Sequence, residues 1–205
     1  MNTKIVKAEE ANAITHARDI LLNGGVVAFP TDTVYGLAAL VTNEEAISRL
    51  YAIKGRQHTK AIAVLMSHMD ELDQVALHPN KDALKLAFDF WPGPLTLIVP
   101  RHPRIPGILS PLPTIGVRVP NHPVALQLLA ETGPLGVTSA NLTGGENTTS
   151  ASEVLAQLND RIHLVLDGGK SPGGIPSTVV DMTGEKPVIL RQGPITEAQI
   201  KATLA

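Results

Sequence analysis

The chain has 205 residues, of which 43% are hydrophobic and 18% are charged. This composition supplies enough apolar residues for a core and excludes a disordered chain, and the length fits one domain. The 17 basic and 19 acidic residues give a formal net charge of -2, which excludes a surface-wide cationic field for nucleic acid, so any RNA contact must be local. Cysteine is absent, which excludes disulfides, thiol catalysis and cysteine-ligated metal sites.

The sequence lacks the features of secreted and membrane proteins. Its N-terminal segment has no apolar core of a secretion signal, and no stretch approaches about 18 uninterrupted apolar residues. We therefore expect a cytoplasmic protein with no membrane partner. The 17 glycines and 16 prolines, set against 3% aromatic residues, indicate many loops, which is where functional groups concentrate.

The first half of the chain alternates helical and extended apolar patterns. Short apolar runs predict strands at residues 26–29, 61–66 and 95–99, and residues 31–37 follow the first strand as a polar loop. Periodic apolar residues predict helices at 9–23 and from Asn43 to Lys54. A third helix, at 80–91, is expected to turn four side chains inward: Leu84, Ala87, Phe88 and Trp91.

The second half continues this alternation. Further strands are predicted at 116–119, 135–138, 162–166, 178–182 and 188–190. Helices are predicted at 123–131 and after the capping signals Ser150-x-x-Glu153 and Thr196-x-x-Gln199. The last strands are joined by segments too short for crossover helices, so the sheet should be mixed. We predict one α/β domain over residues 1–205, with a mixed parallel and antiparallel sheet flanked by helices.

Four polar clusters follow predicted strands or end a helix: PTDTVYG (30–36), KGR (54–56), TSANLTG (138–144) and STVVD (177–181). They offer hydroxyl groups, amides and cations, with only the isolated carboxylates Asp32 and Asp181, whereas acid–base catalysis calls for paired groups. Hydroxyl groups, backbone N–H groups at helix starts and Lys or Arg are what recognition of phosphate or carboxylate requires. The clusters therefore indicate a site that positions anions.

Each cluster alone also has a purely structural explanation. The Ser-Ala-Asn at 139–141 is common turn chemistry, and Lys54 and Arg56 can complement a helix dipole. Their functional interpretation is that both face phosphates, with Gly55 letting the backbone come close. Arg118 differs because it lies inside an apolar strand, where a long cation needs a solvent-facing position or an anionic partner.

Two other kinds of site are disfavoured by spacing. Gly169-Lys170-Ser171 resembles part of a phosphate-binding P-loop, but that motif needs glycine at position 164, which is leucine. We predict instead a flexible loop at 168–174, either a connector or a lid over residues 177–181. The seven histidines show no i, i+4 pair, so we predict no dedicated metal site, and any metal should arrive with a nucleotide.

Seven motifs in a fixed order are together more specific than any one of them. They are PTDTVYGL, KGR, PGPLT, VRVPNHP, TSANLTG, STVVD and LRQG. In this order, over residues 28–193, they resemble the YrdC-like family of L-threonylcarbamoyladenylate synthases. The resemblance implies a YrdC-like fold, with a twisted mixed sheet around a deep positive cleft. It also implies the conversion of L-threonine, bicarbonate and ATP to threonylcarbamoyl-AMP and pyrophosphate, the first step of threonylcarbamoyladenosine modification of tRNA.

The resemblance also implies residue roles, position by position. Threonine contacts are implied at Thr33, Arg118, Val137 and Ser177. ATP contacts are implied at Arg56, Lys60, Thr114, Ser139, Asn141, Asn147 and Arg191. Lys54 and Arg56 form the family's Lys-x-Arg signature and are the implied catalytic cations. Attack of a carbamate oxygen on the α-phosphate joins two anions, so cations and hydroxyl groups can catalyse it without a general base. Mg²⁺ is expected with ATP and not at a protein site.

The sequence departs from the family pattern after Arg56. Many relatives have an asparagine and a histidine where this chain has Lys60 and Leu65. These departures support the alternative, a nucleotide- or RNA-binding relative without synthase activity. A carbamoyl-transfer enzyme of hydrogenase maturation fits less well, because such proteins carry further domains.

The resemblance implies a set of partners as well. The small molecules are ATP, L-threonine and bicarbonate, and the product is expected to pass to the tRNA threonylcarbamoyl transferase complex. A weak direct contact with tRNA is a further expectation. The extra C-terminal domain of longer relatives is not seen, so closure over ATP is expected from residues 168–174 or from the C-terminus.

Overall fold

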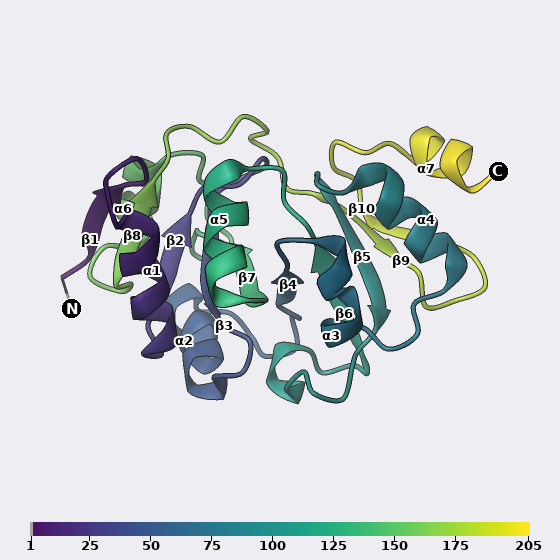
Figure 1. The fold of residues 1–205 in the computed structure, drawn as a ribbon, viewed down its shortest axis with the longest axis horizontal. Helices are drawn as coiled ribbons and strands as arrows, with labels where there is room; N and C mark the ends of the chain where they lie inside the picture. Colours follow the sequence, from purple (N-terminus) through teal and green to yellow (C-terminus); the bar gives the residue numbers. More distant parts are fainter. Residues whose placement is uncertain (1) are drawn as a thin grey trace.

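A ten-stranded sheet runs through the molecule from one end to the other (Figure 1). The structure, a computed structural model, describes residues 2–205. The strands are β1 (Lys4–Lys7), β2 (Val27–Phe29), β3 (Gly36–Leu40), β4 (Ala63–Leu65), β5 (Leu95–Pro100), β6 (Thr114–Arg118), β7 (Leu135–Ser139), β8 (Leu164–Asp167), β9 (Thr178–Asp181) and β10 (Val188–Arg191). Their order across the sheet is β1-β8-β2-β3-β7-β4-β6-β5-β9-β10.

Both parallel and antiparallel neighbours occur in this sheet, which confirms the mixed sheet expected from the sequence. β9 and β10 are joined by the short segment 182–187 and pair antiparallel. Parallel neighbours such as β5 and β9 lie far apart in the sequence, because a parallel pair needs a long crossover. Short connections therefore determine the direction of the last strands.

Seven α-helices accompany the sheet in the described residues. They are α1 (Ala13–Leu22), α2 (Glu44–Lys54), α3 (Leu72–Val75), α4 (Lys81–Phe90), α5 (Pro123–Thr132), α6 (Ala151–Leu158) and α7 (Glu197–Leu204). Two 3₁₀ turns, η1 (Met69–Glu71) and η2 (Gly107–Leu109), lie between them. Within residues 2–205, no helix is long and apolar enough to cross a membrane.

Alternate residues of β2 show that the sheet is covered on both faces. Val27 and Phe29 pack in a core with residues of α1 and α5, whereas Ala28 belongs to the core that contains residues of α2, α4 and α6. All three residues are fully buried. A strand buried on both faces has a continuous apolar sequence, which is the pattern that predicted this strand.

The ends of α2 follow from local sequence signals. The side-chain oxygen of Asn43 accepts a hydrogen bond from the backbone N–H of Ala46, at 2.9 Å, which confirms the expected helix start. After Lys54, Gly55 has φ 58°, a left-handed conformation that glycine adopts without strain. The structure thus explains Gly55 by the backbone at the helix end, whereas the sequence interpretation explained it by close approach to a phosphate.

Two expectations about secondary structure are wrong. Residues 36–40 form β3, although the polar loop was expected to continue to residue 37; β3 pairs with β2 on one side and β7 on the other. In α4, Leu84 is 38% exposed and Phe88 is 78% exposed, whereas Ala83, Leu86 and Ala87 are buried. Of the four side chains expected to turn inward, Ala87 and Trp91 are therefore buried as predicted, and Leu84 and Phe88 are not, because the helix packs against β5 and α7.

Candidate active site

Polar clusters that lie far apart in the sequence meet at a cavity of about 310 Å³. Its wall takes residues from the loop after β2, from the ends of β6, β7 and β10, and from the segment before β9. Three wall residues are arginines, Arg56, Arg118 and Arg191, and within the described chain no Asp or Glu belongs to the wall. The cavity is therefore suited to anions.

Most site residues implied by the family resemblance belong to this wall. The structure brings together Thr33, Arg56, Arg118, Val137, Ser139, Asn147, Ser177 and Arg191. Four others lie outside the wall: Lys54, Lys60, Thr114 and Asn141. The wall therefore contains one of the two expected catalytic cations, Arg56, and not the other.

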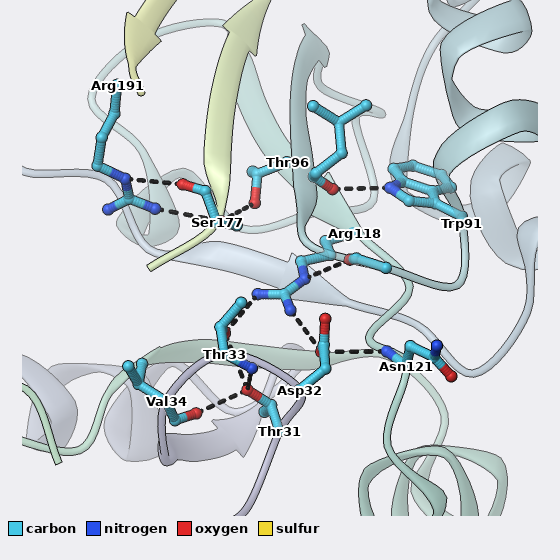
Figure 2. Close-up of polar contacts among 12 residues, drawn as sticks. Thr31, Asp32, Thr33, Val34, Trp91, Thr96, Arg118, Asn121, Ser177 and Arg191 are labelled. Carbon is cyan, nitrogen blue, oxygen red and sulfur yellow. Dashed lines mark hydrogen bonds and ion pairs between the residues drawn. The ribbon is translucent and has the colours of Figure 1, made fainter. Parts of the chain in front are cut away.

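Arg118 lies at the end of β6, and its side chain is only 7% exposed. Figure 2 shows its guanidinium group directed toward the loop after β2. Its Nε donates to the backbone oxygen of Gly93 at 2.9 Å, one terminal nitrogen donates to Thr33 Oγ1 at 3.1 Å, and the other lies 2.5 Å from Asp32 Oδ1. Burial lowers the pKa of Arg118, and the negative charge of Asp32 opposes that shift. Three of its five N–H groups are used, so two remain for a ligand.

The hydroxyl hydrogen of Thr33 has a direction that its neighbours determine. Thr31 Oγ1 donates its one hydrogen to the backbone oxygen of Val34, at 2.6 Å. In the 3.0 Å contact between the two threonine hydroxyls, Thr33 must therefore be the donor. Thr33 Oγ1 also accepts from Arg118, so what it presents to the cavity is a free lone pair. It can accept an N–H or O–H from a ligand, and it cannot donate to an anion.

Arg191, at the end of β10, is bound by neutral oxygens. Its Nε donates to the backbone oxygen of Ser177 at 2.9 Å, and a terminal nitrogen donates to the hydroxyl of the same residue at 3.2 Å (Figure 2). The Ser177 hydroxyl lies 2.8 Å from that of Thr96 on β5. Burial lowers the pKa of Arg191, and so does the positive charge of Arg56. Among residues 2–205, neither of these two like charges has a carboxylate partner.

Arg56 follows α2 and is held by the backbone that comes after it. Its Nε donates to the backbone oxygen of Lys60 at 3.2 Å, and a terminal nitrogen donates to that of Ala61 at 2.8 Å. The side chain of Lys60 is exposed and lies outside the wall, so its contribution is a carbonyl group. The family resemblance implied a direct contact between the Lys60 side chain and ATP, and the geometry does not support that contact.

Lys54, the last residue of α2, is buried and turned away from the cavity wall. Its Nζ donates to the backbone oxygen of Ser139 at 2.5 Å, to the backbone oxygen of Asn141, and to Asn141 Oδ1 at 3.2 Å. All three hydrogens of the ammonium group are thus used within the protein. Burial lowers the pKa of Lys54 to about 7, with a smaller contribution from Arg56. Direct contact with phosphate, expected from the sequence, does not fit this geometry.

Asn141 and Thr114 also differ from their expected positions. Asn141 receives the hydrogen bonds from Lys54, and its amide nitrogen donates to the backbone oxygen of Gly145 at 2.8 Å. Thr114 is half-buried at the start of β6, opposite Pro100 of β5. Both residues support elements that carry wall residues, and neither reaches the cavity.

The glycine-rich loop at 168–174 lies against the loop after β2. The hydroxyl of Tyr35 donates to the backbone oxygen of Gly169 at 2.7 Å. The backbone N–H of Gly174 donates to the backbone oxygen of Thr33 at 2.8 Å. A Cβ atom on Gly173 would lie 2.6 Å from the backbone oxygen of Asp32. The loop is therefore held against residues 32 and 33, whereas the sequence interpretation had considered a lid over residues 177–181.

The sequence analysis did not predict the roles of three side chains that support the site: Thr31, Asp32 and Thr96. Thr31 and Asp32 lie within a motif that had been noticed, but their partners are distant in the chain or depend on a hydroxyl direction. Thr96 is a hydroxyl residue on an otherwise apolar strand, which was the available signal. Leu65 also lines the cavity, so one of the two positions at which the sequence departs from the expected family pattern supplies an apolar side chain.

Comparison with known proteins identifies the family. The family model Sua5_yciO_yrdC, described as "Telomere recombination", matches residues 19–193. The chain belongs to the Sua5/YciO/YrdC family. The YrdC-like resemblance inferred from the seven motifs is confirmed.

Relatives of this family match most of the chain. A threonylcarbamoyl-AMP synthase of Bacillus subtilis is 39% identical over 194 residues, which are 93% of this chain and 56% of the relative. A putative threonylcarbamoyl-AMP synthase of Mycobacterium tuberculosis is 34% identical over 197 residues, 96% of this chain and 91% of the relative. The chain therefore spans little more than half the length of the first relative and nearly all of the second.

A solved structure agrees with the fold. The crystal structure of Pyrococcus abyssi Sua5 complexed with L-threonine matches with a TM-score of 0.95 and 35% sequence identity. The match covers 98% of this chain and 61% of that one. The mixed α/β sheet of residues 2–205 is thus the fold of the Sua5/YciO/YrdC family.

Proposed function

We propose that the chain is an L-threonylcarbamoyladenylate synthase, which makes threonylcarbamoyl-AMP and pyrophosphate from L-threonine, bicarbonate and ATP. The observation that carries the proposal is that one cavity combines two different anion subsites. Arg118 with Thr33 suits an amino acid, and Arg56 with Arg191 suits a polyanion. The names of the relatives, threonylcarbamoyl-AMP synthases, support the same assignment.

In the threonine subsite, the two unused N–H groups of Arg118 bind the carboxylate. The lone pair of Thr33 accepts a hydrogen from the amino group or the hydroxyl group of the substrate. Leu65 and Val137 supply apolar wall next to these groups, where the methyl group of threonine can pack. A carboxylate, a donor and a methyl group are the features that threonine offers.

In the ATP subsite, Arg56 and Arg191 face the phosphates, and Ser139 and Asn147 add neutral hydrogen-bonding groups. Mg²⁺ fits this proposal as a companion of ATP, because the described wall contains hydroxyl groups and no carboxylate. Bound to the phosphate oxygens, the ion would neutralise charge as pyrophosphate leaves.

The reaction then needs little proton transfer from the protein. Threonine carboxylated on nitrogen attacks the α-phosphorus through a carbamate oxygen, and that new P–O bond forms as the bond to the β-phosphate breaks. Pyrophosphate departs with the electron pair. Because two anions meet in this step, Arg56 and Arg191 catalyse it by neutralising charge, and Arg118 holds the threonine carboxylate in line. Lys54 contributes by holding the backbone of Ser139.

The alternative is a nucleotide- or RNA-binding relative without synthase activity. The observation in its favour is the exposed position of Lys60 and the apolar Leu65, where many relatives have asparagine and histidine. Release of pyrophosphate from ATP, measured with and without threonine and bicarbonate, distinguishes the two. A synthase releases pyrophosphate only when both are present, and an Arg56→Gln variant should lose that release.

The product also suggests partners. A threonylcarbamoyl adenylate is a mixed anhydride, activated for acyl transfer, so an enzyme that transfers the group to an adenosine of tRNA must consume it. The tRNA threonylcarbamoyl transferase complex is the proposed recipient. A weak tRNA contact is proposed with it, and gel-shift titration of tRNA against the purified chain tests that contact.

A further inference from the structure

The three arginines of the cavity differ in what balances their charge. Arg56 donates to backbone oxygens, and Arg191 donates to the carbonyl and hydroxyl oxygens of one serine. These acceptors are neutral, so both guanidinium groups present an uncompensated charge. Arg118 is paired with a carboxylate, because its terminal nitrogen lies 2.5 Å from Asp32 Oδ1. The cavity thus has a cationic half and a half in which the charge is already neutralised.

We propose that Asp32 sets the specificity of the amino-acid half: by neutralising Arg118, it lets this half accept a zwitterionic amino acid and reject phosphate groups. The inference rests on the proposed function and deepens it. Asp32 is outside the cavity wall, so it acts through Arg118 and is a positioning and specificity residue.

The geometry fixes the carboxylate of Asp32 in place. Its side chain is 11% exposed, and Oδ1 accepts a second hydrogen bond, from the backbone N–H of Asn121 at 3.1 Å (Figure 2). Its other oxygen, Oδ2, is buried and has no hydrogen-bond partner among the described residues. Water therefore screens this negative charge poorly, and an anion bound at Arg118 experiences it.

Charge arithmetic then separates the two kinds of ligand. The repulsion between Asp32 and a bound anion is proportional to the anion's charge. A phosphate monoester carries about -1.5 to -2 at neutral pH, whereas the carboxylate of an amino acid carries -1 beside a positive ammonium group. A neutralised Arg118 therefore favours a ligand of no net charge.

The hydroxyl of Thr33 acts in the same direction. Because its hydrogen is directed to Thr31, it presents a lone pair to the ligand. An amino group can donate to that lone pair, but a phosphate monoester dianion has no hydrogen to donate, and the dianion of inorganic phosphate has only one. Phosphate at Arg118 would thus meet one repelling charge and one repelling lone pair.

The test compares inorganic phosphate and L-threonine as ligands of the whole chain by calorimetric competition. In the wild type, we expect phosphate to weaken ATP binding and to leave threonine binding unchanged. In Asp32→Asn, we expect phosphate to displace threonine. The affinity of phosphate for the amino-acid half should be at least about tenfold higher in this variant than in the wild type. Asparagine keeps the shape, its oxygen can accept the same two hydrogen bonds, and its amide nitrogen replaces the unpartnered oxygen.

Asp181→Asn is the matched control for loss of one negative charge. Its carboxylate accepts from the backbone N–H and the hydroxyl of Thr183, and no arginine among the described residues pairs with it. This variant should bind phosphate and threonine as the wild type does. Asp32→Glu keeps the charge and should continue to exclude phosphate from threonine's half.

Competition between phosphate and threonine in the wild type overturns the inference, and so does an Asp32→Asn variant that still excludes phosphate. If Asp32→Asn does not fold, the wild type and Asp32→Glu still test the inference. It requires that phosphate fail to displace threonine from either protein. Failure of the proposed function has a different signature. A wild type that binds threonine but releases no pyrophosphate contradicts the synthase and leaves the binding inference intact.

Discussion

The ammonium group of Lys54 lies 3.2 Å from the side-chain oxygen of Asn141, and the hydroxyl of Ser139 donates to that same oxygen at 2.5 Å. Lys54 ends α2, whereas Ser139 ends β7 and lines the cavity. One buried cation therefore joins a helix end to a strand end of the candidate site. In the proposed reaction, this makes Lys54 a positioning residue for Ser139.

Lys54→Met tests that role against direct contact with phosphate. Removing the ammonium group takes the lysine donor from two backbone oxygens and leaves Asn141 Oδ1 with the Ser139 hydroxyl as its donor, so we expect a loss of about 3 kcal/mol in the free energy of unfolding. Urea denaturation measures it. Lys201→Met is the matched control, because its pair with Glu197 is exposed and screened by water, so its loss should change the free energy of unfolding little. A Lys54→Met variant of normal stability that has lost ATP affinity would restore the phosphate-contact hypothesis.

The pKa of Lys54 predicts a pH dependence of stability. Burial lowers that pKa to about 7 in the folded chain, from its ordinary value of 10.5. Between these values the unfolded chain binds more protons, so this residue makes the free energy of unfolding rise with pH, by at most about 1.4 kcal/mol per pH unit. Its unfavourable contribution is largest below the folded pKa and fades toward the unfolded one.

The measurement is the difference in unfolding free energy between the wild type and Lys54→Met, taken from about pH 7 to about pH 9. This difference should grow in favour of the wild type. The range stops below the titration of Tyr35, whose pKa burial raises to about 12 and whose contribution to stability declines above about pH 10. A difference that does not change with pH contradicts the lowered pKa of Lys54.

Arg118 and Arg191 should affect different substrates. A lysine at position 118 keeps the charge beside Asp32 but cannot match the fork of three contacts, so we expect the threonine KM to rise roughly 10- to 100-fold. Arg191→Lys should raise the KM for ATP instead, since Arg191 lies in the half without a carboxylate. Steady-state kinetics with each substrate varied separates the effects. Equal changes in both KM values for either variant contradict the division of the cavity.

Local signals predicted the parts of the fold that depend on neighbours in sequence. Asn43 caps α2, and Thr196 with Gln199 forms a complete capping box at α7, both as the sequence indicates. The strand β3 was missed because it gains its stability from β2 and β7 on either side. The buried face of α4 was predicted only in part, with Leu84 and Phe88 exposed, for a similar reason: its partner α7 lies more than a hundred residues later.

The candidate site was likewise predictable where it depends on local motifs and not where it depends on distant contacts. Ordered motifs predicted which loops meet, and the wall residues Thr33, Arg56, Arg118 and Arg191 were found in this way. The role of Lys54 was not predictable, because two of its three acceptors are backbone oxygens about 85 residues away. Sequence patterns record side-chain chemistry, but they do not record which carbonyl groups a folded chain turns inward.

The last prediction concerns Gly173 in the loop that lies against Asp32 and Thr33. A Cβ atom there would lie 2.6 Å from the backbone oxygen of Asp32 and 2.9 Å from the Cα of Thr33, so Gly173→Ala must displace either the loop or the threonine subsite. We expect the threonine KM to rise at least about tenfold with little change in the ATP KM, because small displacements of binding groups are costly. Gly184→Ala is the control, since its Cβ would meet only a backbone oxygen at 3.7 Å. If Gly173→Ala behaves like Gly184→Ala, the loop does not support the threonine subsite.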